Sequence, residues 1–114
     1  MEPIDGAAFC DLTTIGRITG RRHTIEIWFA HREGTVYFLS GGGDRSDWVR
    51  NIATTPSVTV AVGVTVQTGR ARIVTDDAEQ RVARDLVYAK YQPGYGGDLV
   101  SWRETSLPVA VDLD

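Results

Sequence analysis

Most of the chain consists of short segments separated by turn residues. In these segments apolar and polar residues alternate or β-branched residues predominate, which limits the folds the chain can form. The clearest is residues 57–62, Ser-Val-Thr-Val-Ala-Val, a composition typical of a β-strand. Similar segments occupy residues 8–15, 23–30, 35–40, 66–74 and 107–113. Consecutive short strands without regular strand–helix alternation favour hairpins over a parallel sheet. We therefore predict a six-stranded antiparallel sheet that closes into a barrel.

Two helices are expected between these strands. Ser46 is placed to cap a short helix over residues 47–53. Asp76 followed by Glu79 resembles a capping box, and apolar residues then recur at helical spacing to about Lys90. The expected fold class is mainly β, or α+β, with one short and one longer helix. All 114 residues fit one domain.

Charge and cysteine content exclude several classes of partner. The net charge of −3 argues against general nucleic-acid binding. Cys10 is the only cysteine, so neither an internal disulfide nor a cysteine zinc cluster can form, and no clustered histidines suggest a metal site. The acidic start, residues 1–5, lacks a signal pattern, and no segment has the roughly 18 apolar residues of a membrane span. We predict a cytoplasmic protein without stable membrane insertion.

A run of three glycines, residues 41–43, is the most informative local feature. Glycines accept positive φ angles and can turn several backbone N–H groups toward one point. The helix expected directly after them adds free N–H groups and a partial positive charge, which together suit a phosphate. Arg45 and Arg50 add basic groups at either end. The alternative is a flexible loop before an ordinary helix cap.

A second segment, residues 12–23, joins threonines at a strand end to a basic turn that contains Arg17, Arg21 and Arg22. Arginine presents a planar set of donors that suits phosphate and carboxylate groups, so this turn could bind a second anionic part of a ligand. The alternative is a plain hairpin turn with solvated arginines.

Aromatic residues could line a pocket for a planar ligand. The candidates are Trp28, Trp48, Trp102, Tyr88, Tyr91 and Tyr95. Core packing is the alternative, especially for the tryptophans at 28 and 48. Conventional catalytic sets are absent from the sequence, so in an enzyme a bound cofactor would carry the chemistry.

In this order, these segments resemble the deazaflavin-dependent nitroreductase and quinone reductase family. The resemblance runs from Phe9 onward and is carried by residues 12–20, 27–29, 40–43, 48–58, 91–102 and 107–111. It implies a split β-barrel of the flavin-reductase type that binds coenzyme F-420, an 8-hydroxy-5-deazaflavin. It also implies an oxidoreductase that transfers a hydride to a quinone, nitro or enone-type acceptor, as a monomer or homodimer.

The resemblance also implies roles for individual residues. The residues expected to meet the cofactor phosphate are Gly42, Gly43, Arg45, Ser46 and Asn51. Trp48 is expected to anchor the helix that carries this site. Those expected to meet the anionic tail are Arg17, Thr19, Gly20, Arg21 and Arg22. Trp28 and Ser40 are expected near the deazaflavin ring. The catalytic candidates, as hydrogen-bond donors to the acceptor, are Ser40, Tyr91 and Tyr95.

Several positions depart from the family pattern. Gly41 stands where a lysine often follows the serine, Leu99 replaces a frequent tyrosine, and Glu26 replaces a residue that is usually uncharged. The segment before the first strand is also short. Two other interpretations remain open: an FMN-binding protein on the same barrel, and a protein that binds a cofactor or another ligand without catalysis.

Overall fold

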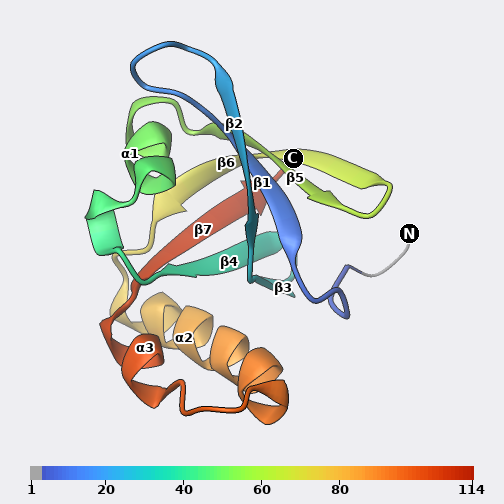
Figure 1. Cartoon of the computed structure of the whole chain (residues 1–114), viewed down its shortest axis with the longest axis vertical. Helices are drawn as coiled ribbons and strands as arrows, with labels where there is room; N and C mark the ends of the chain where they lie inside the picture. The colour runs from blue at the N-terminus through green and yellow to red at the C-terminus, as the bar shows by residue number, and fades with distance from the viewer. Residues whose placement is uncertain (1–3) are drawn as a thin grey trace.

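An antiparallel sheet of seven strands, curled into a half-open barrel, forms the body of the protein (Figure 1). The computed structural model describes residues 4–114, so the first three residues of the acidic start lie outside it. Along the sheet the strand order is β2-β1-β5-β6-β7-β4-β3. The strands are β1 Cys10–Ile15, β2 Arg22–Ile27, β3 Ala30–Arg32, β4 Thr35–Ser40, β5 Ser57–Val62, β6 Thr65–Ile73 and β7 Leu107–Leu113. This confirms the predicted mainly antiparallel α+β class.

The predicted six strands become seven because the segment predicted as one strand over residues 23–30 changes partner midway. Its first part, β2, pairs with β1, with Cys10 opposite Ile27. Its last residue begins β3, which pairs with β4 through Ala30 and Tyr37. Phe29 lies at the bend and is fully buried. The bend directs this ring into the core and lets the chain turn the corner of the barrel.

Two apolar layers stabilise the sheet. One fills the barrel beneath helix α1 (Asp47–Thr54) and includes Val109 and Val111. The other lies between the sheet and helix α2 (Asp77–Tyr91) and includes Ala110. Strand β7 is therefore buried on both faces, which explains why consecutive rather than alternating residues are apolar there.

Three α-helices accompany the sheet in the described part of the chain, one more than predicted. The third, α3 (Val100–Thr105), packs against α2, and two short 3₁₀ turns, η1 (Gly43–Arg45) and η2 (Gln92–Gly94), precede α1 and α3. The cap predicted for α2 is confirmed, since the Asp76 carboxylate accepts a hydrogen bond from the Glu79 N–H at 2.9 Å. Within residues 4–114, none of the helices has the length and apolarity needed to cross a bilayer.

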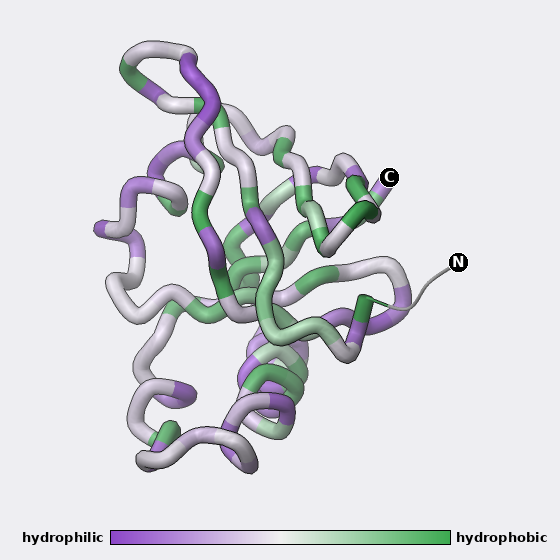
Figure 2. Tube along the Cα trace, turned by 45° about the vertical axis from the view of Figure 1, so that its right-hand side comes forward, coloured by the Kyte–Doolittle hydropathy of each residue, from purple (hydrophilic) through white to green (hydrophobic). Residues whose placement is uncertain are grey.

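The turn between β1 and β2 projects beyond the sheet next to α1, and its trace is mostly hydrophilic or neutral in hydropathy (Figures 1 and 2). Apolar segments concentrate in the sheet, whereas hydrophilic and hydrophobic residues alternate along α2 (Figure 2). The projecting turn therefore contributes little to the core and is available to form one wall of a cavity.

Candidate functional site

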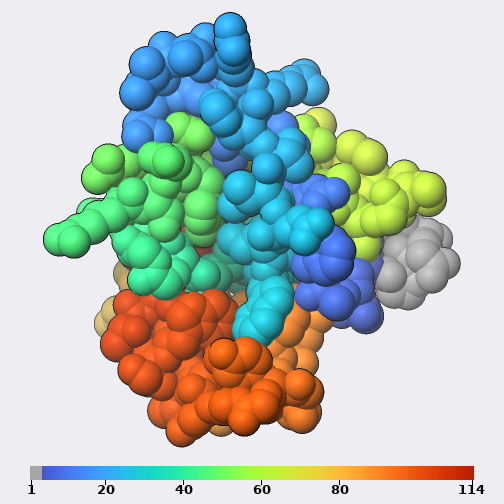
Figure 3. All heavy atoms as spheres, viewed as in Figure 1, coloured from blue at the N-terminus to red at the C-terminus, as the bar shows by residue number. Residues whose placement is uncertain are grey.

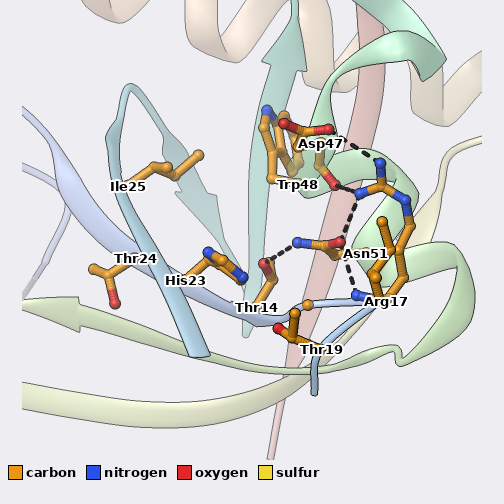
Figure 4. Close-up of a pocket in the computed structure, with 11 residues that line it drawn as sticks. Thr14, Arg17, Thr19, His23, Thr24, Ile25, Asp47, Trp48 and Asn51 are labelled. Atoms are coloured by element: carbon orange, nitrogen blue, oxygen red, sulfur yellow. Dashed lines mark hydrogen bonds and ion pairs between the residues drawn. The ribbon is translucent and has the colours of Figure 1, made fainter. Parts of the chain in front are cut away.

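A cavity of about 490 Å³, here called the α1 cavity, opens between the β1–β2 turn and helix α1 (Figure 4). Its size falls within the range usual for small-molecule sites. The residues that line it are Thr14, Gly16, Arg17, Ile18, Thr19, His23, Thr24, Ile25, Asp47, Trp48 and Asn51. It therefore brings together parts of two segments that the sequence singled out separately.

Asn51 joins the two walls of the α1 cavity. Its Oδ1 accepts hydrogen bonds from the backbone N–H of Arg17 at 3.2 Å and from Arg17 Nη1 at 2.9 Å. Its Nδ2 donates to Thr14 Oγ1 at 3.1 Å, and Arg17 Nη2 forms an ion pair with Asp47 at 3.1 Å (Figure 4). Asn51 is buried. Asn51 and Arg17 thus build the wall, and a phosphate or carboxylate could still accept from the Arg17 Nε–H, for which no partner occurs in residues 4–114.

The glycine run forms a tight loop supported by two serines. Ser40 Oγ donates to the Gly43 carbonyl at 2.9 Å and lies 3.0 Å from Ser46 Oγ. Gly43 has a φ of 62°, and a Cβ on Gly42 would lie 2.5 Å from Ser46 Oγ. Ser40 is only 2% exposed, so its hydroxyl is turned into the loop. The loop adjoins α1, but its residues are not among those that line the α1 cavity.

The start of α1 and the arginines around it leave positive groups without partners. Ser46 stands at the N-cap of α1, but its side chain makes no capping hydrogen bond. Arg45, Arg21 and Arg22 form no side-chain hydrogen bond or ion pair with any residue in 4–114, and all three are exposed. Arg21 and Arg45 lie in segments that adjoin the α1 cavity, whereas Arg22 lines a separate hollow of about 390 Å³ with Ser57 and Arg70. Free backbone N–H groups and unpaired arginines are what an anionic ligand requires.

A cluster of aromatic rings surrounds Trp28, which follows the end of β2. Trp28 stacks on Tyr91 with 4.2 Å between ring centroids and 3° between planes. Tyr95 and Trp102 each meet Trp28 edge-on at 5.8 Å. Trp28 lines two cavities: one of about 330 Å³ shared with Tyr91, Tyr95 and Lys90, and one of about 320 Å³ shared with Trp102. The structure thus brings Trp28, Tyr91 and Tyr95 together in one cluster.

The three catalytic candidates differ in the freedom of their hydroxyls. Tyr91 Oη accepts a hydrogen bond from the Phe29 N–H at 3.0 Å and donates to the Ala8 carbonyl at 2.8 Å, and burial raises its pKa. The Ser40 hydroxyl is used within the glycine loop. Tyr95 is 47% exposed, and its hydroxyl has no partner in residues 4–114.

Two further side chains near these cavities were not predicted from the sequence. Asp47 lines the α1 cavity and neutralises Arg17. Lys90, the only lysine, donates from Nζ to the Phe29 carbonyl at 2.9 Å and lies 3.6 Å from the Phe29 ring centroid. Burial lowers the pKa of Lys90. Nothing local to the sequence signals these contacts, because each joins residues at least 30 positions apart.

Structures of known proteins share this fold. An F420-H2-dependent reductase matches with a TM-score of 0.71 and 21% identity, covering 94% of this chain and 94% of that chain. A candidate 5-nitroimidazole antibiotic resistance protein from Bacteroides thetaiotaomicron matches with a TM-score of 0.74 and 15% identity, covering 95% and 74%. A third, described as a domain-swapped dimer, matches with a TM-score of 0.74 and 19% identity, covering 91% and 79%.

A comparison with curated proteins finds no match to the sequence. The family model for F420H(2)-dependent quinone reductase, in contrast, matches residues 2–114, which is nearly the whole chain. This match supports coenzyme F-420 as the cofactor and confirms the resemblance drawn from the sequence segments. The chain belongs to the F420H(2)-dependent quinone reductase family.

Proposed function

We propose that the protein is an oxidoreductase that binds reduced coenzyme F-420, which supplies a hydride, and reduces a quinone, nitro or enone-type acceptor. Membership of an F-420-dependent quinone reductase family supports the cofactor and the reaction class. The observation that carries the assignment to this chain is the uncapped start of α1 with unpaired arginines beside a cavity of about 490 Å³.

The anionic end of the cofactor would lie against α1 and the β1–β2 turn. The first N–H groups of α1 lack a side-chain acceptor, so they can donate to a phosphate. Arg45 directly precedes the N-cap Ser46 and can add a charge-assisted hydrogen bond. Arg21 would meet a carboxylate tail along the turn, whereas Arg22 lines a separate hollow of about 390 Å³ and is not assigned to the tail.

The acceptor would lie against the aromatic cluster. The stacked pair Trp28 and Tyr91 presents flat apolar surface that excludes water from a planar acceptor. Tyr95 alone among the three catalytic candidates has a free hydroxyl, so we assign to it the hydrogen bond that stabilises negative charge developing on the acceptor oxygen. Tyr91 and Ser40, whose hydroxyls are already bonded, would act by positioning their surroundings.

Titration of the purified protein with oxidised F-420, and separately with FMN, tests cofactor binding through quenching of tryptophan fluorescence. Arg45→Ala is expected to weaken F-420 binding about tenfold, which is the loss of one charge-assisted contact of roughly 1.5 kcal/mol. Arg32→Ala is the matched control, because Arg32 is equally unpaired in residues 4–114 and lines neither the α1 cavity nor the aromatic cavities. An unchanged dissociation constant in Arg45→Ala would remove Arg45 from the site.

Turnover distinguishes an enzyme from a protein that only binds the cofactor. With reduced F-420 and a soluble quinone, oxidation of the cofactor is followed by absorbance. Tyr95→Phe is expected to lower kcat about tenfold or more without weakening F-420 binding, because the lost hydrogen bond acts on the acceptor. Tight F-420 binding with no reduction of quinones, nitroaromatics or enones would contradict the enzymatic proposal.

Oligomeric state and location are part of the same proposal. One protein of this fold is described as a domain-swapped dimer. We infer that this chain is a monomer or homodimer in the cytoplasm, where a single buried thiol stays reduced. Light scattering on the purified protein measures the mass directly.

A further inference from the structure

The cavity that Trp28 shares with Trp102 lies at the end of β2 and is separate from the α1 cavity. We call it the Glu26 groove; its volume is about 320 Å³, and it is lined by Phe9, Glu26, Ile27, Trp28, Leu39 and Trp102. It shares no lining residue with the α1 cavity. In Figure 3, β2 runs down the middle of the visible face and meets the C-terminal helices below it.

The charge of the Glu26 groove is negative and unbalanced. Glu26 is the only charged residue that lines it, is exposed, and has no hydrogen-bond or ion-pair partner in residues 4–114. Asp11 stands directly opposite Glu26 on the neighbouring strand β1, so both carboxylates lie on the same face of the sheet. Asp11 also lacks a cationic partner in that part of the chain. Like charges opposite each other destabilise a strand pair, and a bound cation would relieve this cost.

The remaining walls are suited to a flat cation. Trp28 and Trp102 meet edge-on, and the stacked Tyr91 ring holds Trp28 in place. Phe9 is 46% exposed although it is a large apolar ring, and it takes part in none of the ring contacts within residues 4–114. Aromatic faces attract cations, and tryptophan does so most strongly. A carboxylate beside three aromatic rings is therefore complementary to a delocalised positive charge.

From this arrangement we infer that the Glu26 groove binds a flat aromatic cation, and that Glu26 selects the ligand by its charge. In one respect the inference rests on the proposed function. Because Trp28 belongs to both the groove and the aromatic cluster, a cation bound in the groove would be the substrate that accepts the hydride. The preferred acceptors would then be positively charged nitrogen heteroaromatic compounds. Glu26 is a specificity-determining residue in this scheme and takes no part in proton transfer.

Isothermal titration calorimetry without any cofactor tests the groove directly. The probes are N-methylquinolinium, a flat cation, and naphthalene-1-carboxylate, an anion of similar size. The cation is expected to bind at least about tenfold more tightly than the anion, as opposite charge and ring contacts both favour it. Equal affinities, tighter binding of the anion, or no binding of the cation would overturn the inference.

Variants assign the preference to particular residues. Glu26→Gln keeps the shape of the side chain and removes its charge, so it is expected to lower the affinity for the cation about three- to tenfold. Glu33→Gln removes another exposed carboxylate, in the β3–β4 turn, and should leave both affinities unchanged. Phe9→Ala should weaken the binding of the cation as well, because it removes a ring from the wall. A Glu26→Gln variant with unchanged preference would refute the role of Glu26.

The outcomes separate this inference from the proposed function. Binding of the cation in the calorimeter, with no reduction of any acceptor by reduced F-420, would leave the groove in place and contradict the enzymatic proposal. Reduction of neutral, anionic and cationic acceptors at equal kcat/KM, with no charge preference in binding, would support the enzyme and refute the groove.

Discussion

The ring of Trp28 lies parallel to that of Tyr91, with 4.2 Å between their centroids, and the hydroxyl of the same tyrosine bonds the backbone at Ala8, before β1, and at Phe29, after β2. One residue of α2 thus fixes an aromatic surface and also ties the start of the chain, at Ala8, to the bend at Phe29. This arrangement explains why an aromatic side chain with a polar tip is found here.

Tyr91→Phe separates these two roles, because the ring stays and only the hydroxyl is lost. The variant leaves the Phe29 N–H and the Ala8 carbonyl without their partner, so the free energy of unfolding is expected to fall by about 1–2 kcal/mol. Amide exchange at Phe29 should accelerate. Tyr88→Phe is the control, since the Tyr88 hydroxyl has no hydrogen-bond partner in residues 4–114. Unchanged exchange at Phe29 would contradict this role of the hydroxyl.

Asn51→Ala is expected to destabilise the protein by about 2–3 kcal/mol. The substitution removes three hydrogen bonds and leaves the Thr14 hydroxyl unpaired in a buried setting. Urea denaturation measures the change. Thr54→Ala, at an exposed position on the same helix, should change the stability by less than about 0.5 kcal/mol. Equal stabilities of the two variants would show that Asn51 does not hold the β1–β2 turn to α1.

Gly42→Ala is expected to disturb the glycine loop, because its new methyl group would lie 2.5 Å from Ser46 Oγ. The Ser46 hydroxyl would have to rotate away, which breaks its contact with Ser40 Oγ at the start of α1. We expect F-420 binding to weaken several-fold and the melting temperature to fall. Gly94→Ala serves as the matched control, because a Cβ there meets no atom within 4 Å. If both variants bound F-420 like the parent protein, the geometry of the loop would not matter for the cofactor.

The ionic network around Arg72 predicts a loss of stability in acid. Hydrogen bonds from Arg72 hold the pKa values of Glu79 and Asp112 below their ordinary values. A carboxyl group whose pKa is lowered on folding stabilises the native state above its unfolded pKa and loses that contribution as the pH falls through its folded pKa. Stability should therefore decline as the pH drops below about 4.5, the ordinary value for Glu79.

Glu79→Gln should flatten this decline, because one of the two carboxylates no longer titrates. Thermal unfolding followed from pH 6 to about pH 3 measures it. Glu33→Gln, which removes an exposed and unpaired carboxylate, should keep the slope of the parent protein. A parent slope retained in Glu79→Gln would show that this network does not set the acid stability.

The sequence determined the elements whose pattern is local. The strands at residues 57–62 and 107–113 have the predicted bounds, and α1 and the cap of α2 at Asp76 lie where predicted. Strand composition and helix caps depend on residues within a few positions of one another, so they can be read from the chain alone. The family resemblance rested on the order of such local segments, and the family match confirms it.

Only the tertiary structure decided the features that depend on distant partners. Helix α3 is short and follows a glycine-rich segment. It is held by a residue of α2, because Arg84 Nη1 donates to the carbonyls of Arg103 and Ser106 at the end of α3. The strand at residues 23–30 divides because its two halves pair with different strands. The α1 cavity, the engagement of Arg17 by Asp47, and the unpaired Glu26 arise where segments far apart in sequence meet. Contacts of this kind leave no period or motif in the chain, which is why the sequence suggested which residues take part but not how they are arranged.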